Sequence, residues 1–129
     1  ELVHDGREEP IFAFLDACSA GQAKEATRLL EKLLQGGASE AQVIGMLIKQ
    51  FRGALAARDL VDRGQADPTL LARTIGLHPY VASKAIAFAR RHPLAKLTAR
   101  FERLVAMERD LKSGGPAPRV SLALFASGA

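Results

Sequence analysis

Basic side chains at helical spacing are the feature of this sequence with the clearest capacity to bind a partner. Lys96, Arg100, Arg103 and Met107 follow one another at intervals of four, three and four residues, so a helix would bring them onto one face. Arg and Met are enriched at protein–protein interfaces. The row is interpreted either as a solvated helix face or as a contact surface for a partner subunit, with Met107 expected to be exposed at its end.

Residues 67–91 have the pattern of a helix–turn–helix, in which two short helices meet at Gly76, a residue that tolerates a left-handed turn. In DNA-binding proteins the second helix enters the major groove with polar side chains near its start. Here Pro79 and Tyr80 stand where base-reading proteins favour Arg, Asn or Gln, so the pair is interpreted mainly as a packing unit. DNA binding is the alternative hypothesis. Its candidate contacts are Ser83, Lys84, Arg90 and Arg91.

The residues required for the common catalytic and metal-binding chemistries do not occur in a recognisable pattern. A nucleotide-binding loop of the type G-x-x-x-x-G-K-[ST] is missing, and the histidines His4, His78 and His92 are too scattered to form a zinc site. His78 and His92 each precede a proline and are interpreted as residues at the starts of helices. We therefore expect a non-catalytic chain without catalytic, cofactor-binding or metal-binding residues.

The composition indicates one ordinary globular domain in a reducing, cytoplasmic environment. Apolar residues make up 48% and charged residues 25% of the 129 residues, which is typical of globular proteins. The single cysteine, Cys18, excludes an internal disulfide and is expected to be buried as a small apolar residue. Neither an apolar stretch long enough to span a membrane nor a signal peptide is recognised.

The charge is distributed unevenly along the chain. Residues 1–48 carry four basic and eight acidic side chains, whereas residues 49–129 carry fourteen basic and six acidic side chains. A basic half favours a polyanionic neighbour, although solvated basic helix faces are commoner. The chain begins with Glu1 rather than Met, so we expect a fragment of a longer protein or a processed one.

Prolines and glycines divide the sequence into about seven predicted helices. A proline fits the first turn of a helix, because its missing N–H has no intrahelical partner there, and a glycine fits the position after the last turn. Asp67–Pro68, His78–Pro79 and His92–Pro93 each predict a cap followed by a first-turn proline. The predicted helices run over about 10–18, 22–35, 39–63, 67–75, 78–89, 93–112 and 118–125.

These elements predict an all-α fold, a single helical bundle of about six to seven helices over residues 10–129. Residues 1–9 are interpreted as a linker or a residual upstream segment. Ser39 and Gln42 predict a capping box at the start of the longest helix. The face of the 93–112 helix that is expected to be buried carries Leu97, Phe101, Leu104 and Leu111.

A series of short stretches, taken in order, covers nearly the whole chain. They are 7–12 with 15–17, 21–34, 47–48 with 50–52, 75–81 with Lys84, 89–91 and 110–114. The ordered set resembles the C-terminal domain of bacterial DNA polymerase III delta subunits, and the residues after Pro116 match least.

This resemblance implies a helical collar domain of the AAA+ clamp-loader type, which holds its subunit in the complex that loads the sliding clamp during DNA replication. The implied partners are the other clamp-loader subunits. Two upstream domains, related to ATPases but without ATP hydrolysis, would contact the sliding clamp. DNA contact would be indirect, and no membrane is involved.

Overall fold

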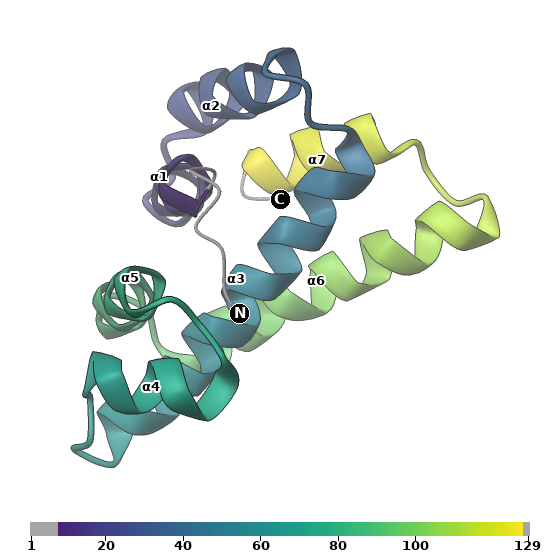
Figure 1. Cartoon of the computed structure of the whole chain (residues 1–129). Coiled ribbons are helices and arrows are strands. Elements are labelled where there is room, and N and C mark those ends of the chain that lie inside the picture. The colour runs from purple at the N-terminus through teal and green to yellow at the C-terminus, as the bar shows by residue number, and fades with distance from the viewer. Residues whose placement is uncertain (1–7, 128–129) are drawn as a thin grey trace.

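The computed structural model of this chain describes residues 8–127, in which it contains seven α-helices and no strand (Figure 1). The predicted all-α fold is therefore confirmed. Residues 1–7 of the predicted linker over residues 1–9 lie outside the described residues. The helices are α1 (Glu8–Ser19), α2 (Ala23–Gln35), α3 (Glu40–Asp62), α4 (Pro68–Ile75), α5 (Pro79–Arg90), α6 (Leu94–Ser113) and α7 (Pro118–Ala126).

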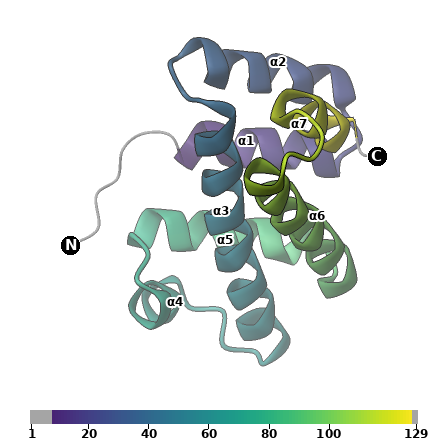
Figure 2. The same ribbon diagram turned by 90° about the vertical axis from the view of Figure 1, so that its right-hand side faces the viewer.

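Helix α3 runs through the middle of the molecule, with the other helices arranged around it (Figure 2). It begins with the predicted capping box, in which the Ser39 hydroxyl accepts from the Gln42 N–H at 3.1 Å and the Gln42 side chain accepts from the Ser39 N–H at 2.9 Å. Buried side chains such as Ile44, Leu47 and Phe51 recur along it. This helix provides the surface on which α5 and α6 make their largest contacts.

Helices α4 and α5 form the predicted corner at one end of α3. The Asp67 carboxylate accepts from the Thr69 N–H at 3.0 Å, and the His78 Nδ1 accepts from the Tyr80 N–H at 3.1 Å. Both side chains thus cap their helices, as predicted. Gly76 between them has φ 70° and ψ 42°, the left-handed conformation that the turn requires.

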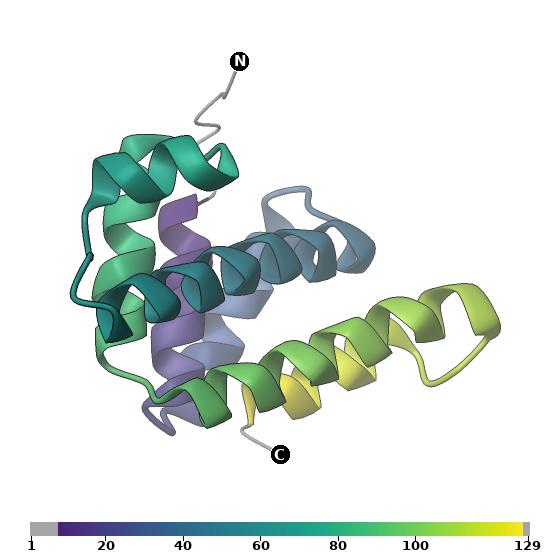
Figure 3. The ribbon, with the colours of Figure 1, turned by 90° about the horizontal axis from the view of Figure 1, so that it is seen from below.

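The chain reverses after α6, and α7 packs back against α6, α2, α3 and α1 (Figure 3). Phe125 of α7 is fully buried. Its ring centroid lies 6.3 Å from that of Phe14 in α1 and 6.4 Å from that of Phe51 in α3. One aromatic side chain therefore joins the last helix to two others.

Two predicted helix starts differ from the structure. Helix α1 begins at Glu8 rather than Pro10, because a proline is equally acceptable anywhere in a first turn whose N–H groups have no intrahelical partner. Helix α6 begins at Leu94, with Pro93 itself as the capping residue. His92 does not cap this helix, since its ring lies 4.5 Å from the Phe88 ring and packs there instead.

The buried face of α6 is rotated relative to the prediction. Met107, which we expected to be exposed, is only 7% exposed, whereas Leu111, which we expected in the core, is 36% exposed. Both expectations were wrong. Helix α7 runs back along α6 from the turn at 114–117, and the packing between helices decides which apolar side chain of α6 is covered.

Candidate partner interface on α6 and α7

The outward side of α7 carries two large apolar side chains that are exposed. Val120 is 54% exposed and Leu124 is 49% exposed, and their spacing of four places them on one face. Ala117 and Ala123 are exposed beside them. We call these four residues the α7 outer face.

The one charged side chain of α7 points away from this face. Arg119 Nη2 forms an ion pair with Glu31 at 2.7 Å, and Arg119 Nη1 lies 3.8 Å from Glu40. The opposite side of α7 is buried through Leu122 and Phe125. Apart from Arg119 and Ser121, helix α7 consists of apolar residues and proline, with apolar side chains on both its buried and its outward side.

The predicted row on α6 is only partly available to a partner. Lys96 is exposed and Arg103 is half-buried, but Met107 is buried. The Arg100 guanidinium turns inward and donates to the carbonyl oxygens of Phe125 at 3.0 Å and Cys18 at 3.4 Å. Its carbon also lies 4.8 Å from the centroid of the Phe125 ring, a cation–π contact.

Burial shifts the pKa values of Arg100 and of its neighbour Cys18. Burial lowers the pKa of the Arg100 guanidinium, because a desolvated group disfavours its charged form. The same effect raises the pKa of the Cys18 thiol to about 11, against the opposing influence of Arg100. Cys18 is a buried thiol, as expected, rather than a reactive thiolate.

Several cationic side chains lie near the turn between α5 and α6. Burial lowers the pKa of His92, and the charges of Lys96, Arg91 and Arg100 lower it further, whereas Asp16 raises it. Arg58 of α3 also reaches this turn. Its Nη1 donates to the carbonyl oxygens of Ala89 at 2.8 Å and His92 at 3.3 Å, and its Nη2 donates to Asp62 at 2.6 Å.

The four candidate DNA contacts do not form one free surface. Arg91 Nη2 donates to the Asp16 carboxylate at 2.6 Å, and the Lys84 ammonium lies 5.5 Å from the centroid of the Tyr80 ring. Ser83 and Arg90 are exposed on another side of α5. No observation on these residues favours the helix–turn–helix DNA-binding hypothesis over the packing unit.

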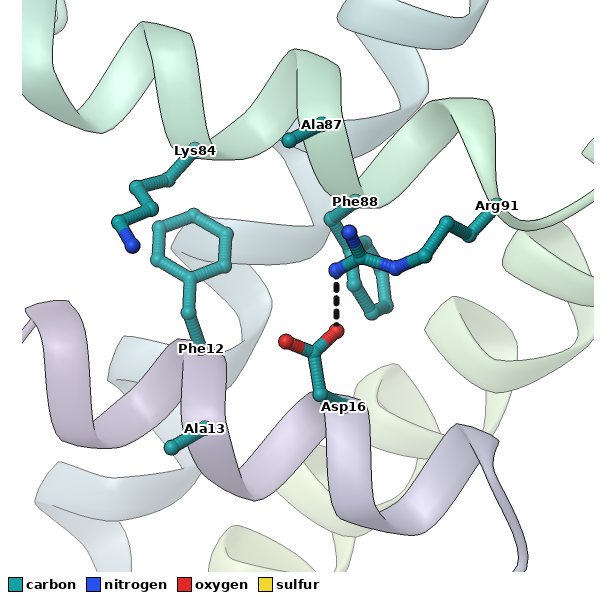
Figure 4. Close-up of a pocket in the computed structure, with 7 residues that line it drawn as sticks. All are labelled: Phe12, Ala13, Asp16, Lys84, Ala87, Phe88 and Arg91. Carbon is teal, nitrogen blue, oxygen red and sulfur yellow. Dashed lines mark hydrogen bonds and ion pairs between the residues drawn. The ribbon is translucent and has the colours of Figure 1, made fainter.

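A groove with a volume of about 220 Å³ lies between α1 and α5, near these cations. Figure 4 shows the Asp16–Arg91 ion pair across it and Lys84 beside the Phe12 ring. The groove is lined by Phe12, Ala13, Asp16, Lys84, Ala87, Phe88 and Arg91. Among residues 8–127 no group of three His, Cys, Asp or Glu side chains is arranged to hold a metal ion.

Sequence reasoning did not select Val120 and Leu124 as site residues. A signal for them was present, because the 118–125 segment is rich in apolar residues at mixed spacing. Mixed spacing in a helix places apolar side chains on both faces.

In the described part of the chain, no helix combines the length and apolar character that crossing a bilayer requires.

Comparison with known proteins agrees with the fold. The family model described as "DNA polymerase III delta subunit, C-terminal domain" matches residues 8–128. The structure of the Bacillus subtilis DNA clamp loader delta protein is similar, with a TM-score of 0.85 at 22% sequence identity. The similarity covers 97% of this chain but only 37% of that one. Curated proteins gave no match. The chain belongs to the family formed by the C-terminal domains of DNA polymerase III delta subunits.

Proposed function

We propose that this domain is a non-catalytic assembly module, which joins its subunit to other subunits of a cytoplasmic clamp-loader complex. The observation that carries the proposal is the α7 outer face, where two large aliphatic side chains stay about half exposed on a helix whose one charged residue, Arg119, is ion-paired with Glu31. Family membership supplies the kind of partner, another clamp-loader subunit. Contact with a sliding clamp would belong to other parts of the protein.

The α7 outer face is small and would form only the central part of a larger contact with a partner. Full burial of an exposed Val or Leu side chain contributes about 1.5–3 kcal/mol. Val120 and Leu124 are already partly covered by the domain itself, so each would add about 1 kcal/mol on assembly. Stable interfaces bury on the order of 1,600 Å², and neighbouring surfaces of the module would supply the remainder.

The test is co-elution of the full-length protein with the other clamp-loader subunits of its organism on size exclusion. The variant Val120→Asp/Leu124→Asp places two charges on the α7 outer face and should elute alone. The matched control is Ile75→Asp/Leu94→Asp, which changes two other exposed aliphatic side chains, 39% and 52% exposed, on α4 and α6. The control should co-elute like the unmodified protein, also at raised salt, because apolar burial does not depend on ionic attraction.

Two results would contradict the proposal in different ways. Unimpaired co-elution of the α7 variant would remove this face as the contact while leaving assembly itself intact. Failure of the unmodified protein to co-elute with any clamp-loader subunit would remove the assembly function.

A further inference from the structure

We infer that the groove between α1 and α5 binds a short extended segment of another polypeptide, by accepting one large apolar side chain and by hydrogen-bonding to the backbone of the same residue. Phe12 and Phe88 form the floor of the groove, and the Asp16–Arg91 ion pair spans it (Figure 4). Its lining residues lie in α1, in α5 and directly after α5, so it is a surface separate from the α7 outer face. This binding site goes beyond the assembly role and does not depend on it.

Small side chains leave room in this groove for an entering side chain. Ala13 of α1 and Ala87 of α5 are exposed beside it, whereas Phe12 is 4% and Phe88 is 1% exposed. The volume of about 220 Å³ is smaller than the roughly 300–1,000 Å³ of small-molecule pockets. Anchor side chains at protein interfaces fill well-packed pockets, so the size favours one apolar side chain over a whole small molecule.

The ion pair across the groove uses only part of its hydrogen-bonding capacity. Arg91 Nη2 donates to Asp16 Oδ1 at 2.6 Å. Among residues 8–127, neither the carboxylate nor the guanidinium makes a further hydrogen bond or ion pair. A guanidinium has five N–H donors and a carboxylate has two accepting oxygens. Figure 4 shows the second oxygen of Asp16 pointing toward the Phe12 side of the groove.

An acceptor beside several donors is complementary to the backbone of an extended peptide. In such a segment the N–H and the C=O of one residue point to the same side, as in the hydrogen-bonded pairs of antiparallel strands. The N–H would donate to Asp16 Oδ2, and the C=O would accept from Arg91. The side chains of this ion pair are 53% and 46% exposed. An exposed ion pair contributes little to stability, so it adjusts to a bound segment at little cost.

A free carboxylate matches this site less well than a peptide group. It has no N–H to donate to Asp16, and the Asp16 charge would repel it. The cations beside the groove are engaged within the domain, since Arg91 is paired with Asp16 and the Lys84 ammonium lies 5.5 Å from the centroid of the Tyr80 ring. We therefore expect selectivity for an uncharged peptide segment over an acidic one.

The experiment titrates the full-length protein with the capped tripeptide acetyl-Gly-Phe-Gly-amide and follows binding by saturation-transfer difference NMR. Acetyl-Gly-Ala-Gly-amide is the comparison ligand without a large side chain. Phenylpropionate is the comparison ligand that carries the ring on a carboxylate without an N–H. Ala87→Leu fills the groove, and the matched control Ala99→Leu adds the same side chain at an exposed alanine of α6. Circular dichroism melting curves verify that the variants fold.

We expect the Phe tripeptide to bind the unmodified protein and Ala99→Leu equally, and Ala87→Leu should abolish this binding. Asp16→Ala should raise the Kd of the tripeptide about tenfold, because a hydrogen bond to a charged group is lost. The same variant should strengthen the binding of phenylpropionate, since Arg91 is then unpaired.

Three results would overturn the inference. The first is that the Phe tripeptide does not bind the unmodified protein. The second is that it binds Ala87→Leu as tightly as Ala99→Leu, which would place its site elsewhere. The third is that either comparison ligand binds the unmodified protein as tightly as the Phe tripeptide, because the groove would then select neither the apolar side chain nor the backbone N–H.

Discussion

Cys18 and Arg100 show how burial changes the chemistry of single residues in this domain. They meet where α1 ends against α6, with the Cys18 carbonyl accepting from the guanidinium at 3.4 Å. Cys18 is 4% exposed, and the guanidinium is held by carbonyl groups rather than by a carboxylate. Each residue therefore departs from its ordinary pKa for the same reason, the loss of water around its charged form.

The raised pKa of Cys18 predicts a specific loss of stability in alkaline solution. The folded-state pKa is about 11, above the ordinary value of 9.0. The thiol therefore stabilises the folded state fully below pH 9, and this stabilisation disappears as the pH rises to 11. Urea unfolding of the unmodified protein should lose about 2 kcal/mol more between these pH values than that of Cys18→Ala. Parallel pH profiles for the two proteins would show that the thiol does not titrate differently on folding.

At the scale of elements, the two glycines inside α3 differ in their surroundings, and only Gly53 lies where the helix closely approaches α4 and α5. A Cβ added at Gly53 would lie 3.3 Å from Leu77 Cδ1 and 3.9 Å from the Ala85 Cβ. A Cβ added at Gly45 would meet nothing within 4 Å. The absence of a side chain at Gly53 therefore permits the crossing of α3 with the α4–α5 corner, whereas Gly45 only costs helix stability.

Substitutions at these glycines should have opposite effects on the free energy of unfolding. Gly45→Ala should stabilise the protein by about 0.5–1 kcal/mol, because glycine is a poor helix former. Gly53→Val should destabilise it by about 1–3 kcal/mol, since the added methyl groups would overpack the contact with Leu77. Urea unfolding measures both. Gly53→Ala serves as the intermediate case and should gain less than Gly45→Ala. An equal gain would mean that the crossing has room to spare.

At the scale of the whole molecule, a chain of aromatic rings connects helices that are distant in the sequence. Phe12 of α1 lies 6.5 Å from Phe88 of α5, and Phe88 lies 5.9 Å from Phe51 of α3. The Phe51 ring in turn lies 6.4 Å from the ring of Phe125 in α7. The Phe125 ring also lies 6.3 Å from that of Phe14 in α1. Four helices thus share one aromatic core, and the position of the α7 outer face depends on it.

Phe125→Ala should destabilise the domain by about 3–5 kcal/mol, because it removes a fully buried ring and leaves a cavity. Leu124→Ala, the adjacent and half-exposed position, should change stability by at most about 0.5 kcal/mol. Thermal or urea unfolding followed by circular dichroism compares the two. A small effect of Phe125→Ala would indicate that α7 is loosely attached, which would also weaken its case as a contact surface.

The sequence by itself determined where most helices begin and end, because caps and turns are local. Each helix cap forms hydrogen bonds to backbone groups two or three residues away, as seen for the Ser39–Gln42 pair, Asp67 and His78. The left-handed conformation of Gly76 is likewise a local feature of the backbone. Such interactions need only neighbours along the chain. The family resemblance likewise depended on the order of short stretches.

The tertiary structure alone decided which side chains face water. Met107 is covered and Leu111 is not, Arg100 turns inward, and Val120 with Leu124 stay outside, although all five lie on correctly predicted helices. Helical spacing groups residues on a face, but it does not specify whether another helix covers that face. That depends on where α7 packs against α6, a contact between distant parts of the chain.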